Sequence, residues 1–324
     1  MMKHPIMRLS GSHSELVEGG RAESLVAWFN LYMELEAAAG SENTVEAKRR
    51  DLGRFLEYFG EGIGGDHIDD WTRSLTAGYL KHLQSEVRLG PTTVNRALAT
   101  LRHCASWIHH RRPFLAGNPC HRISDLHTDA PEWKGLTDME VTRLKAAAEQ
   151  LLHLKSRRNQ NPLRDRAIFL VLLHTGLRIS ELLALDLDQY RGKHFHNVRR
   201  KGKTVTRKTF LAQEAREALD RYVSDVRGYR PGPLFCSQAG TRLGRQNVDT
   251  ALKALASQAN SRLPKNRRIH LSAHILRHTM LRKTAEKHGV QYAMELSGHT
   301  SSRYIWRYVQ PSQDQKEAAL EDLF

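Results

Sequence analysis

A tyrosine in the last quarter of the chain follows an arginine and three histidines at short intervals. Arg277 lies between His274 and His278 in the run His-Ile-Leu-Arg-His, and Tyr308 comes nine residues after His299. A guanidinium group can neutralise two nonbridging oxygens of a phosphodiester, and a side-chain acid can protonate the leaving oxygen. A tyrosine hydroxyl can attack the phosphorus and keep the bond energy as an ester, so that religation needs neither ATP nor a metal. These residue types therefore indicate the cutting and rejoining of DNA.

A second arginine and a basic turn lie upstream of this cluster. Arg178 is part of Thr-Gly-Leu-Arg-Ile-Ser-Glu-Leu over residues 175–182. Lys201 is part of Arg-Lys-Gly-Lys over residues 200–203, between two stretches in which apolar residues sit among Lys, Arg and Thr. This pattern predicts a β-hairpin with a basic tip.

Each of these features has an ordinary explanation when it is taken alone. An arginine after a glycine is most often a surface residue at a helix end, and Tyr308 could be a core aromatic near Tyr304 and Trp306. His274 and His278 could hold a metal from one helix, but no cysteine or third ligand lies nearby, so no metal site is expected. Their conjunction in one chain, in this order, is what indicates phosphotyrosyl chemistry.

The order of the motifs resembles that of the tyrosine recombinase (phage integrase) family. Residues 175–182 are similar to its first arginine box, and residues 274–278 are similar to its second. The nine-residue step from His299 to Tyr308 matches the family's spacing of the nucleophile and favours it over Tyr304. The helical segment before these motifs is similar in kind to the family's core-binding domain.

The resemblance implies a role for each matching residue. Tyr308 would attack the scissile phosphate and become linked to the 3′-phosphate. Lys201 would protonate the leaving 5′-oxygen, although Arg200 replaces the first glycine of the family's Gly-Lys-Gly turn, which leaves Lys203 as an alternative. The other matching residues would be Arg178 and Arg277 as the phosphate clamp, His274 in proton transfer at the tyrosine, His299 as a hydrogen-bond donor to the phosphate, and Glu181 and His278 as supporting residues.

The function that the resemblance implies is site-specific recombination for integration, excision or resolution of a mobile element or replicon. The enzyme would need no cofactor and would act as a homo-tetramer on paired double-stranded DNA sites, with accessory proteins unknown. A type IB topoisomerase shares the chemistry but relaxes DNA as a monomer. A catalytically silent DNA-binding protein is the other alternative, and the filled catalytic positions argue against it. The short N-terminal segment favours a simple two-domain recombinase.

The distribution of charge also favours a nucleic-acid partner. The chain has 50 Lys and Arg against 35 Asp and Glu, a net charge of +15. Residues 1–136 carry a net charge of −1 and residues 137–324 a net charge of +16. A region this basic is expected to bind a polyanion with an affinity that falls steeply with salt.

Helical periodicity predicts a mainly α-helical chain with one small β-hairpin. A loose arm over residues 1–20 would precede a SAM-like core-binding bundle of four helices over 21–119. Residues 120–135 would link the bundle to an α+β catalytic domain over 136–312. A helix over 313–324 would either pack on its own domain or be exchanged between protomers. The first helix is expected to bury one stripe of apolar residues: Leu25, Trp28, Phe29, Tyr32 and Leu35.

Several basic residues of the hairpin are expected to line the DNA: Arg199, Arg200, Lys203, Arg207 and Lys208. Helices at residues 92–102 and 244–253 are the candidates for reading bases in the major groove.

Cysteine usage and hydropathy indicate the compartment. The three cysteines are widely spaced and include no Cys-x-x-Cys pair, which fits a reducing environment. No apolar run approaches the ~20 residues of a membrane helix, and the polar start lacks the apolar core of a signal peptide. A cytoplasmic, nucleoid-associated protein without a membrane partner is therefore expected.

Overall fold

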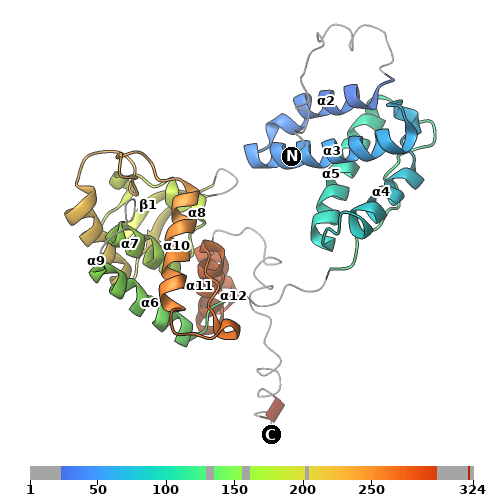
Figure 1. The fold of residues 1–324 in the computed structure, drawn as a ribbon. Helices are drawn as coiled ribbons and strands as arrows, with labels where there is room; N and C mark the ends of the chain where they lie inside the picture. Colours follow the sequence, from blue (N-terminus) through green and yellow to red (C-terminus); the bar gives the residue numbers. More distant parts are fainter. Residues whose placement is uncertain (1–22, 129–134, 155–160, 201–203, 298–319, 322–324) are drawn as a thin grey trace. The chain divides into compact units, whose positions relative to one another are not determined.

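The computed structural model describes residues 23–128, 135–154, 161–200, 204–297 and 320–321. The chain divides into two compact units, Met1–Asp129 and Ala130–Phe324. The described residues are mainly helical and contain one two-stranded sheet, as the sequence predicts (Figure 1). The division falls within the expected linker of residues 120–135.

The first unit is a helical bundle whose helix starts follow the capping rules. Ser24, Ser41 and Thr72 each accept a hydrogen bond from a first-turn backbone N–H, and Pro91 occupies the first turn of the last helix. The four long helices are α2 (Leu25–Leu35), α3 (Glu42–Ile63), α4 (Arg73–Ser85) and α5 (Pro91–Arg111), with short 3-10 turns η1 (Ala37–Ala39) and η2 (Ile68–Asp70).

An aromatic cluster fills the core of this bundle. Phe55 lies at its centre, with ring centroids 5.0 Å from Trp71, 5.1 Å from Tyr79 and 6.1 Å from Phe29. Aromatic pairs at such distances add to the free energy gained by burial alone. Residues 120–126 also lie against this core, because Cys120 is buried and Asn95 forms hydrogen bonds with both backbone groups of Leu126.

The stripe predicted for the first helix is confirmed in its first two turns only. Leu25, Phe29 and Tyr32 are buried, whereas Leu35 is 61% exposed. Leu35 is the last residue of α2, and the buried place beyond it is taken by Ala37 of the following 3-10 turn.

The second unit contains seven α-helices, three short helical turns and a hairpin within its described residues. In chain order they are α6 (Asp138–His153), α7 (Pro162–Thr175), α8 (Ile179–Leu183), η3 (Leu187–Gln189), β1 (His194–Arg199), β2 (Val205–Phe210), α9 (Gln213–Tyr222), η4 (Val223–Arg227), α10 (Arg245–Ala259), η5 (Lys265–Arg267), α11 (Ala273–His288) and α12 (Val290–Ser297). Helix α6 begins with a capping box, in which Thr137 and Glu140 bind each other's backbone N–H groups. Helix α9 ends at Tyr222 and continues as the π-helical turn η4.

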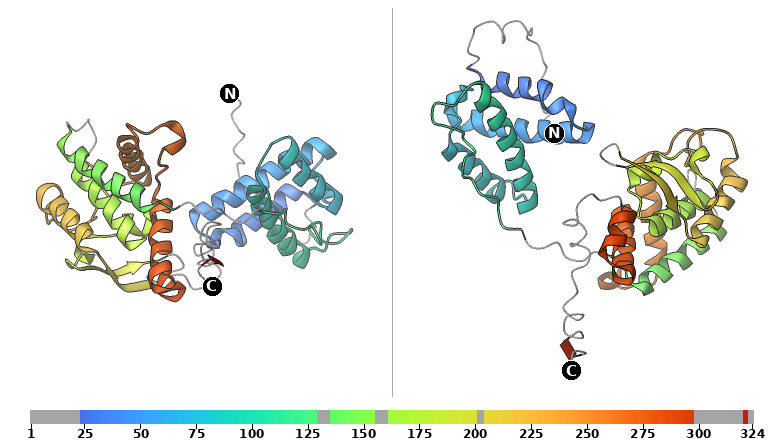
Figure 2. Two further views of the ribbon diagram at one scale, coloured as in Figure 1. Left: turned by 90° about the horizontal axis from the view of Figure 1, so that it is seen from below. Right: turned by 180° about the vertical axis from the view of Figure 1, so that it is seen from behind.

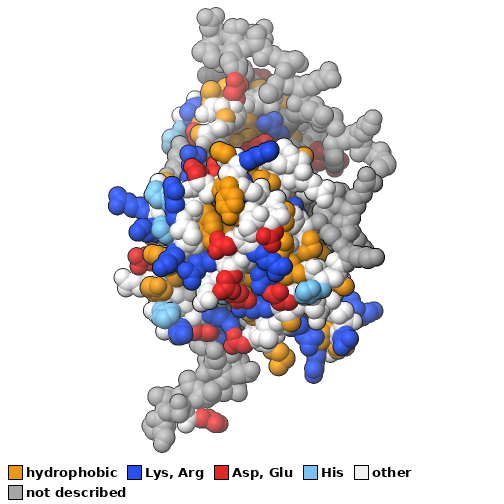
Figure 3. All heavy atoms as spheres, turned by 90° about the vertical axis from the view of Figure 1, so that its left-hand side faces the viewer, with side chains coloured by type: hydrophobic (Ala, Val, Ile, Leu, Met, Phe, Trp, Pro, Cys, Tyr) orange, Lys and Arg blue, Asp and Glu red, His pale blue; other side chains and the backbone are white. Residues whose placement is uncertain are grey.

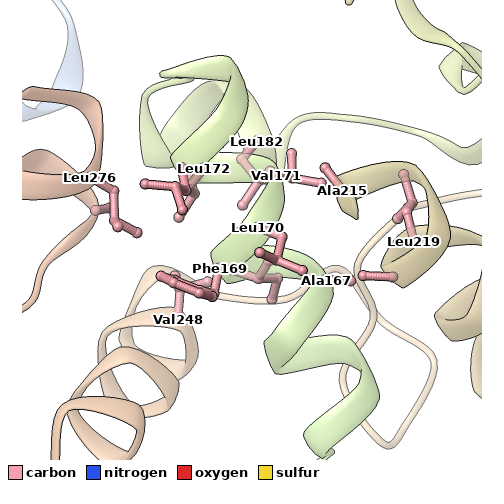
Figure 4. Packing of buried hydrophobic residues seen from close by; sticks show 14 of the residues in the cluster. Ala167, Phe169, Leu170, Val171, Leu172, Leu182, Ala215, Leu219, Val248 and Leu276 are labelled. Carbon is pink, nitrogen blue, oxygen red and sulfur yellow. The ribbon is translucent and has the colours of Figure 1, made fainter. Parts of the chain in front are cut away.

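Helix α7 forms the centre of this unit, as its apolar sequence predicts. Phe169, Leu170, Val171 and Leu172 are all buried although they point to different sides of the helix. Figure 4 shows them among residues of α8, α9, α10 and α11. A helix that is apolar all round must be surrounded by other elements. Here those elements include α8, which Arg178 precedes, and α11, which contains Arg277.

The predicted β-hairpin is confirmed, and it lies at the surface of the second unit (Figure 2). The strands pair antiparallel with His194 opposite Phe210 and Arg199 opposite Val205. The predicted basic tip, residues 201–203, lies outside the described residues, as does most of the predicted tail helix, of which Leu320 and Glu321 are helical.

No helix in the described part of the chain is both long enough and apolar enough to cross a membrane.

Candidate active site

The end of α7 turns the chain so that Arg178 begins the next helix. Gly176 adopts a left-handed conformation with φ 60°, which ends α7 at Thr175. Arg178 then precedes α8, and its backbone N–H donates to Glu181 Oε2 at 2.9 Å. The Arg178 guanidinium donates from Nη1 to Glu181 Oε1 at 2.7 Å, so the carboxylate holds both ends of this residue.

Glu181 is a buried carboxylate with two arginine partners. Only 3% of its side chain is exposed, and its Oε2 also accepts from Arg200 Nη1 at 2.9 Å. Burial alone would raise the pKa of Glu181, but hydrogen bonds from Arg178 and the charge of Arg200 outweigh it and hold the pKa below its ordinary value. The carboxylate is therefore ionised at neutral pH and fixes the Arg178 guanidinium.

The second arginine binds the turn after α7, just before the first arginine. Ser272 caps α11, which carries Arg277 in its second turn, and only 3% of Arg277 is exposed. Its Nη1 donates to the carbonyl oxygen of Gly176, two residues before Arg178. One hydrogen bond thus joins motifs that are about a hundred residues apart in the sequence, and it brings the two predicted clamp residues together.

The two histidines of α11 form a pair. Nε2 of His274 lies 2.6 Å from Nε2 of His278, so one ring N–H donates a hydrogen bond that the other ring nitrogen accepts. Burial lowers the pKa of His274, with further contributions from Arg277 and Arg178. Burial, His274 and Arg277 lower the pKa of His278 to about 4. Both rings are therefore neutral at pH 7, a state in which His274 can accept a proton.

Three of the predicted catalytic residues lie outside the described residues: Lys201, His299 and Tyr308. The same holds for Lys203 and for Tyr304. Within the described residues, no group of three or more His, Cys, Asp or Glu is arranged to hold a metal.

The prediction that Arg200 lines the DNA is wrong for this structure. Its side chain is 2% exposed, and besides Glu181 it donates to Thr206 Oγ1 at 3.0 Å and to Thr209 Oγ1 at 3.3 Å. Its Nη2 also approaches the carbonyl of Leu296, at the end of α12, at 3.5 Å. Sequence reasoning missed this inward role, although Arg200 lies two residues after the buried Val198 and so follows the inward alternation of a strand.

The Lys and Arg residues of the two described strands face solvent. Arg199, Arg207 and Lys208 are exposed, which leaves them available to a polyanion. On the face drawn in Figure 3, Lys and Arg side chains are interspersed with Asp and Glu, so that face is not of a single sign.

A helical unit, followed by a unit that brings two arginines and a histidine pair together, defines a class of enzyme that acts on phosphodiesters. Residues 135–315 match the model of the phage integrase family, and residues 29–112 match that of the phage integrase N-terminal SAM-like domain. The chain therefore belongs to the phage integrase family of tyrosine recombinases, enzymes that cleave and rejoin DNA.

Curated relatives match over most of their length. Tyrosine recombinase XerD of Halalkalibacterium halodurans is 29% identical, over 83% of this chain and 88% of its own. Tyrosine recombinase XerC of Herpetosiphon aurantiacus is 28% identical, over 88% of this chain and 90% of its own. The chain is thus of the Xer and integrase type.

Solved structures show the same fold. The Tn1549 transposon integrase in complex with transposon right end DNA gives a TM-score of 0.69 at 19% identity, covering 93% of this chain and 99% of that one. A lambda integrase dimer bound to a COC′ core site gives 0.67 at 15% identity, covering 89% and 95%.

Proposed function

We propose that this protein is a site-specific recombinase that cleaves and rejoins double-stranded DNA through a 3′-phosphotyrosyl intermediate. The observation that carries the proposal is the junction of the two arginine motifs, in which Arg277 binds the Gly176 carbonyl and Glu181 fixes Arg178. Two guanidinium groups held in this way can stabilise the charge that develops on the nonbridging oxygens. The solved relatives bound to DNA support the choice of substrate.

The proposed roles of the other residues follow the family's motifs. Tyr308 is the nucleophile, and Lys201 is the general acid for the 5′-oxygen. His274 takes part in proton transfer at the tyrosine, which its lowered pKa suits, and His299 donates a hydrogen bond to the phosphate. His278 would set the tautomer of His274 through the hydrogen bond between their rings.

The domain roles are part of the same proposal. Residues 21–119 would bind DNA as the core-binding domain and residues 136–312 would carry the catalysis. A homo-tetramer on two paired sites would perform strand exchange, with residues 313–324 either exchanged between protomers or packed on their own domain. Integration, excision and resolution of an element or replicon are the biological outcomes that such an enzyme can have.

The test is covalent capture. A preferred duplex is first selected from a random-sequence library with the full chain, and is then supplied with a nick near the cleaved bond so that the released strand end is lost. We expect a protein–DNA adduct that survives denaturation with wild-type protein and with Tyr304→Phe. Tyr308→Phe should give none, and an adduct with that variant would refute the proposed nucleophile.

A further inference from the structure

Helix α5 of the first unit presents an exposed stripe with the composition of a DNA-reading surface. None of its residues from Pro91 to Arg111 is acidic. Thr92, Arg96, Ala99 and His103 are exposed and recur at steps of four, three and four residues, so they share one side of the helix. Such a stripe offers hydrogen-bond donors and has no acidic member, although Glu36 Oε1 lies 3.8 Å from His103 Nε2 at its end. The small Ala99 allows close approach of the helix to a groove.

Arg96, in the middle of this stripe, forms an ion pair with the buried carboxylate of Asp51. Asp51 of α3, which lies beside α5 (Figure 1), has a fully buried side chain, whereas the side chain of Arg96 is 41% exposed. Asp51 Oδ2 accepts from Arg96 Nη1 at 2.5 Å and from Thr100 Oγ1 at 3.0 Å. Within the described residues, the other carboxylate oxygen of Asp51 has no hydrogen-bond partner.

This arrangement costs folding free energy, and a function for the orientation of Arg96 would explain why the protein carries it. A buried carboxylate with an unsatisfied oxygen destabilises a bundle, and an apolar residue at position 51 would pack without that cost. The contrast with Arg112 is informative. The Arg112 side chain is only 16% exposed and forms a two-pronged pair with Asp69, which ties both partners into the structure.

Arg96 instead uses one nitrogen for its anchor, and 41% of its side chain remains exposed. Among the described residues, its Nε and Nη2 donate no hydrogen bond, whereas its Nη1 is taken by Asp51. A guanidinium fixed at one nitrogen presents two further donors in a set direction. In the major groove, guanine offers two acceptors, O6 and N7, at the spacing that such a pair of donors fits.

We propose that Arg96, oriented by Asp51, reads a guanine in the major groove of each half-site. The inference rests on the proposed function for the existence of a DNA site, and it assigns one base preference to one side chain. Asp51 is a positioning residue, and Thr100 holds it in turn. A contact of Arg96 with a phosphate would use the same charge but would carry no base preference.

The experiment compares base preferences among variants of the full chain. Duplexes are selected from a random library with wild type, Arg96→Ala, Arg96→Lys and Asp51→Asn, and affinities are then measured on the wild-type duplex and on single-base variants of it. Arg111→Ala is the matched control, because Arg111 is an exposed arginine of the same helix that stacks on Trp107 at 3.8 Å and lies off the stripe.

We expect one guanine position at which Arg96→Ala loses on the order of ten- to a hundredfold in discrimination, with other positions unchanged. Arg96→Lys should lose most of it as well, since a lysine keeps the charge but lacks the paired donors. Asp51→Asn should weaken the same position only. The control should leave the whole preference intact.

The proposal is overturned if Arg96→Ala weakens all duplexes by one factor and reduces the dependence on salt by about one phosphate contact, or if it changes nothing. If Asp51→Asn unfolds at a much lower temperature than wild type, Arg96→Ala and Arg96→Lys still test the base preference, because the Arg96 side chain is partly exposed. Adduct formation by Tyr308 is measured separately. A guanine preference without adducts would therefore refute the proposed chemistry and leave this inference standing, and the reverse result would refute the inference alone.

Discussion

Replacement of Arg200 by methionine tests directly how the second unit assembles its site. Arg200 and Glu181 have side chains that are 2% and 3% exposed, so solvent does not screen their interaction. Removal of one partner from a buried pair costs about 3–5 kcal/mol of unfolding free energy. Arg178 still neutralises Glu181 in the variant, which places the expected loss at the lower end, about 3 kcal/mol.

The assay is calorimetry of the full chain at pH 7. For a unit of this size, a loss of about 3 kcal/mol lowers the midpoint of unfolding by roughly 6–12 °C. Only the transition of the second unit should move, because the hydrogen-bond partners of Arg200 among the described residues belong to that unit. In the variant, Glu181 would keep Arg178 as its one arginine partner among the described residues. We expect the Arg178 guanidinium to shift and the rate of DNA cleavage to fall by about tenfold or more.

Two variants make the result interpretable. Arg199→Met removes an exposed arginine next in sequence and should change the unfolding free energy by no more than about 0.5 kcal/mol. Arg200→Met combined with Glu181→Gln removes both buried charges and should be more stable than Arg200→Met alone. A midpoint shift for Arg200→Met as small as that of Arg199→Met would refute the buried pair and return Arg200 to the surface.

Three further changes probe neighbouring elements. Gly176→Ala places a side chain at φ 60°, and we expect calorimetry to show a loss of about 1–2 kcal/mol. Thr137→Ala removes one half of a capping box and should cost about 1 kcal/mol in the same assay. Because burial lowers the pKa of His278 to about 4, its contribution to stability is present above its ordinary pKa of about 6.5 and is lost as the pH falls toward 4. His278→Asn should therefore flatten the pH dependence of the unfolding midpoint between these values, and an unchanged slope would contradict the pKa.

Local pattern was sufficient to predict most of the elements and part of the site. The helical bundle and the β-hairpin follow from patterns among neighbouring residues, and the structure confirms both. Leu35 was misplaced because periodicity does not show where a helix stops contacting its neighbours. The proximity of Arg178 and Arg277 followed from a resemblance, whereas the hydrogen bond to Gly176 that produces it depends on a turn in tertiary contact with α11.

The sequence identified Glu181 as a supporting residue but did not show that this carboxylate is buried and also binds Arg200, and that explains the error at Arg200. A basic residue in a basic hairpin is reasonably assigned to the DNA surface by composition alone. Its direction is decided instead by Glu181, which is nineteen residues away and becomes a neighbour only after folding. Asp51 does the same for Arg96 across forty-five residues. In both units the direction of an arginine is set by a buried acid, so the acid must be located before the arginine can be assigned to DNA or to the fold.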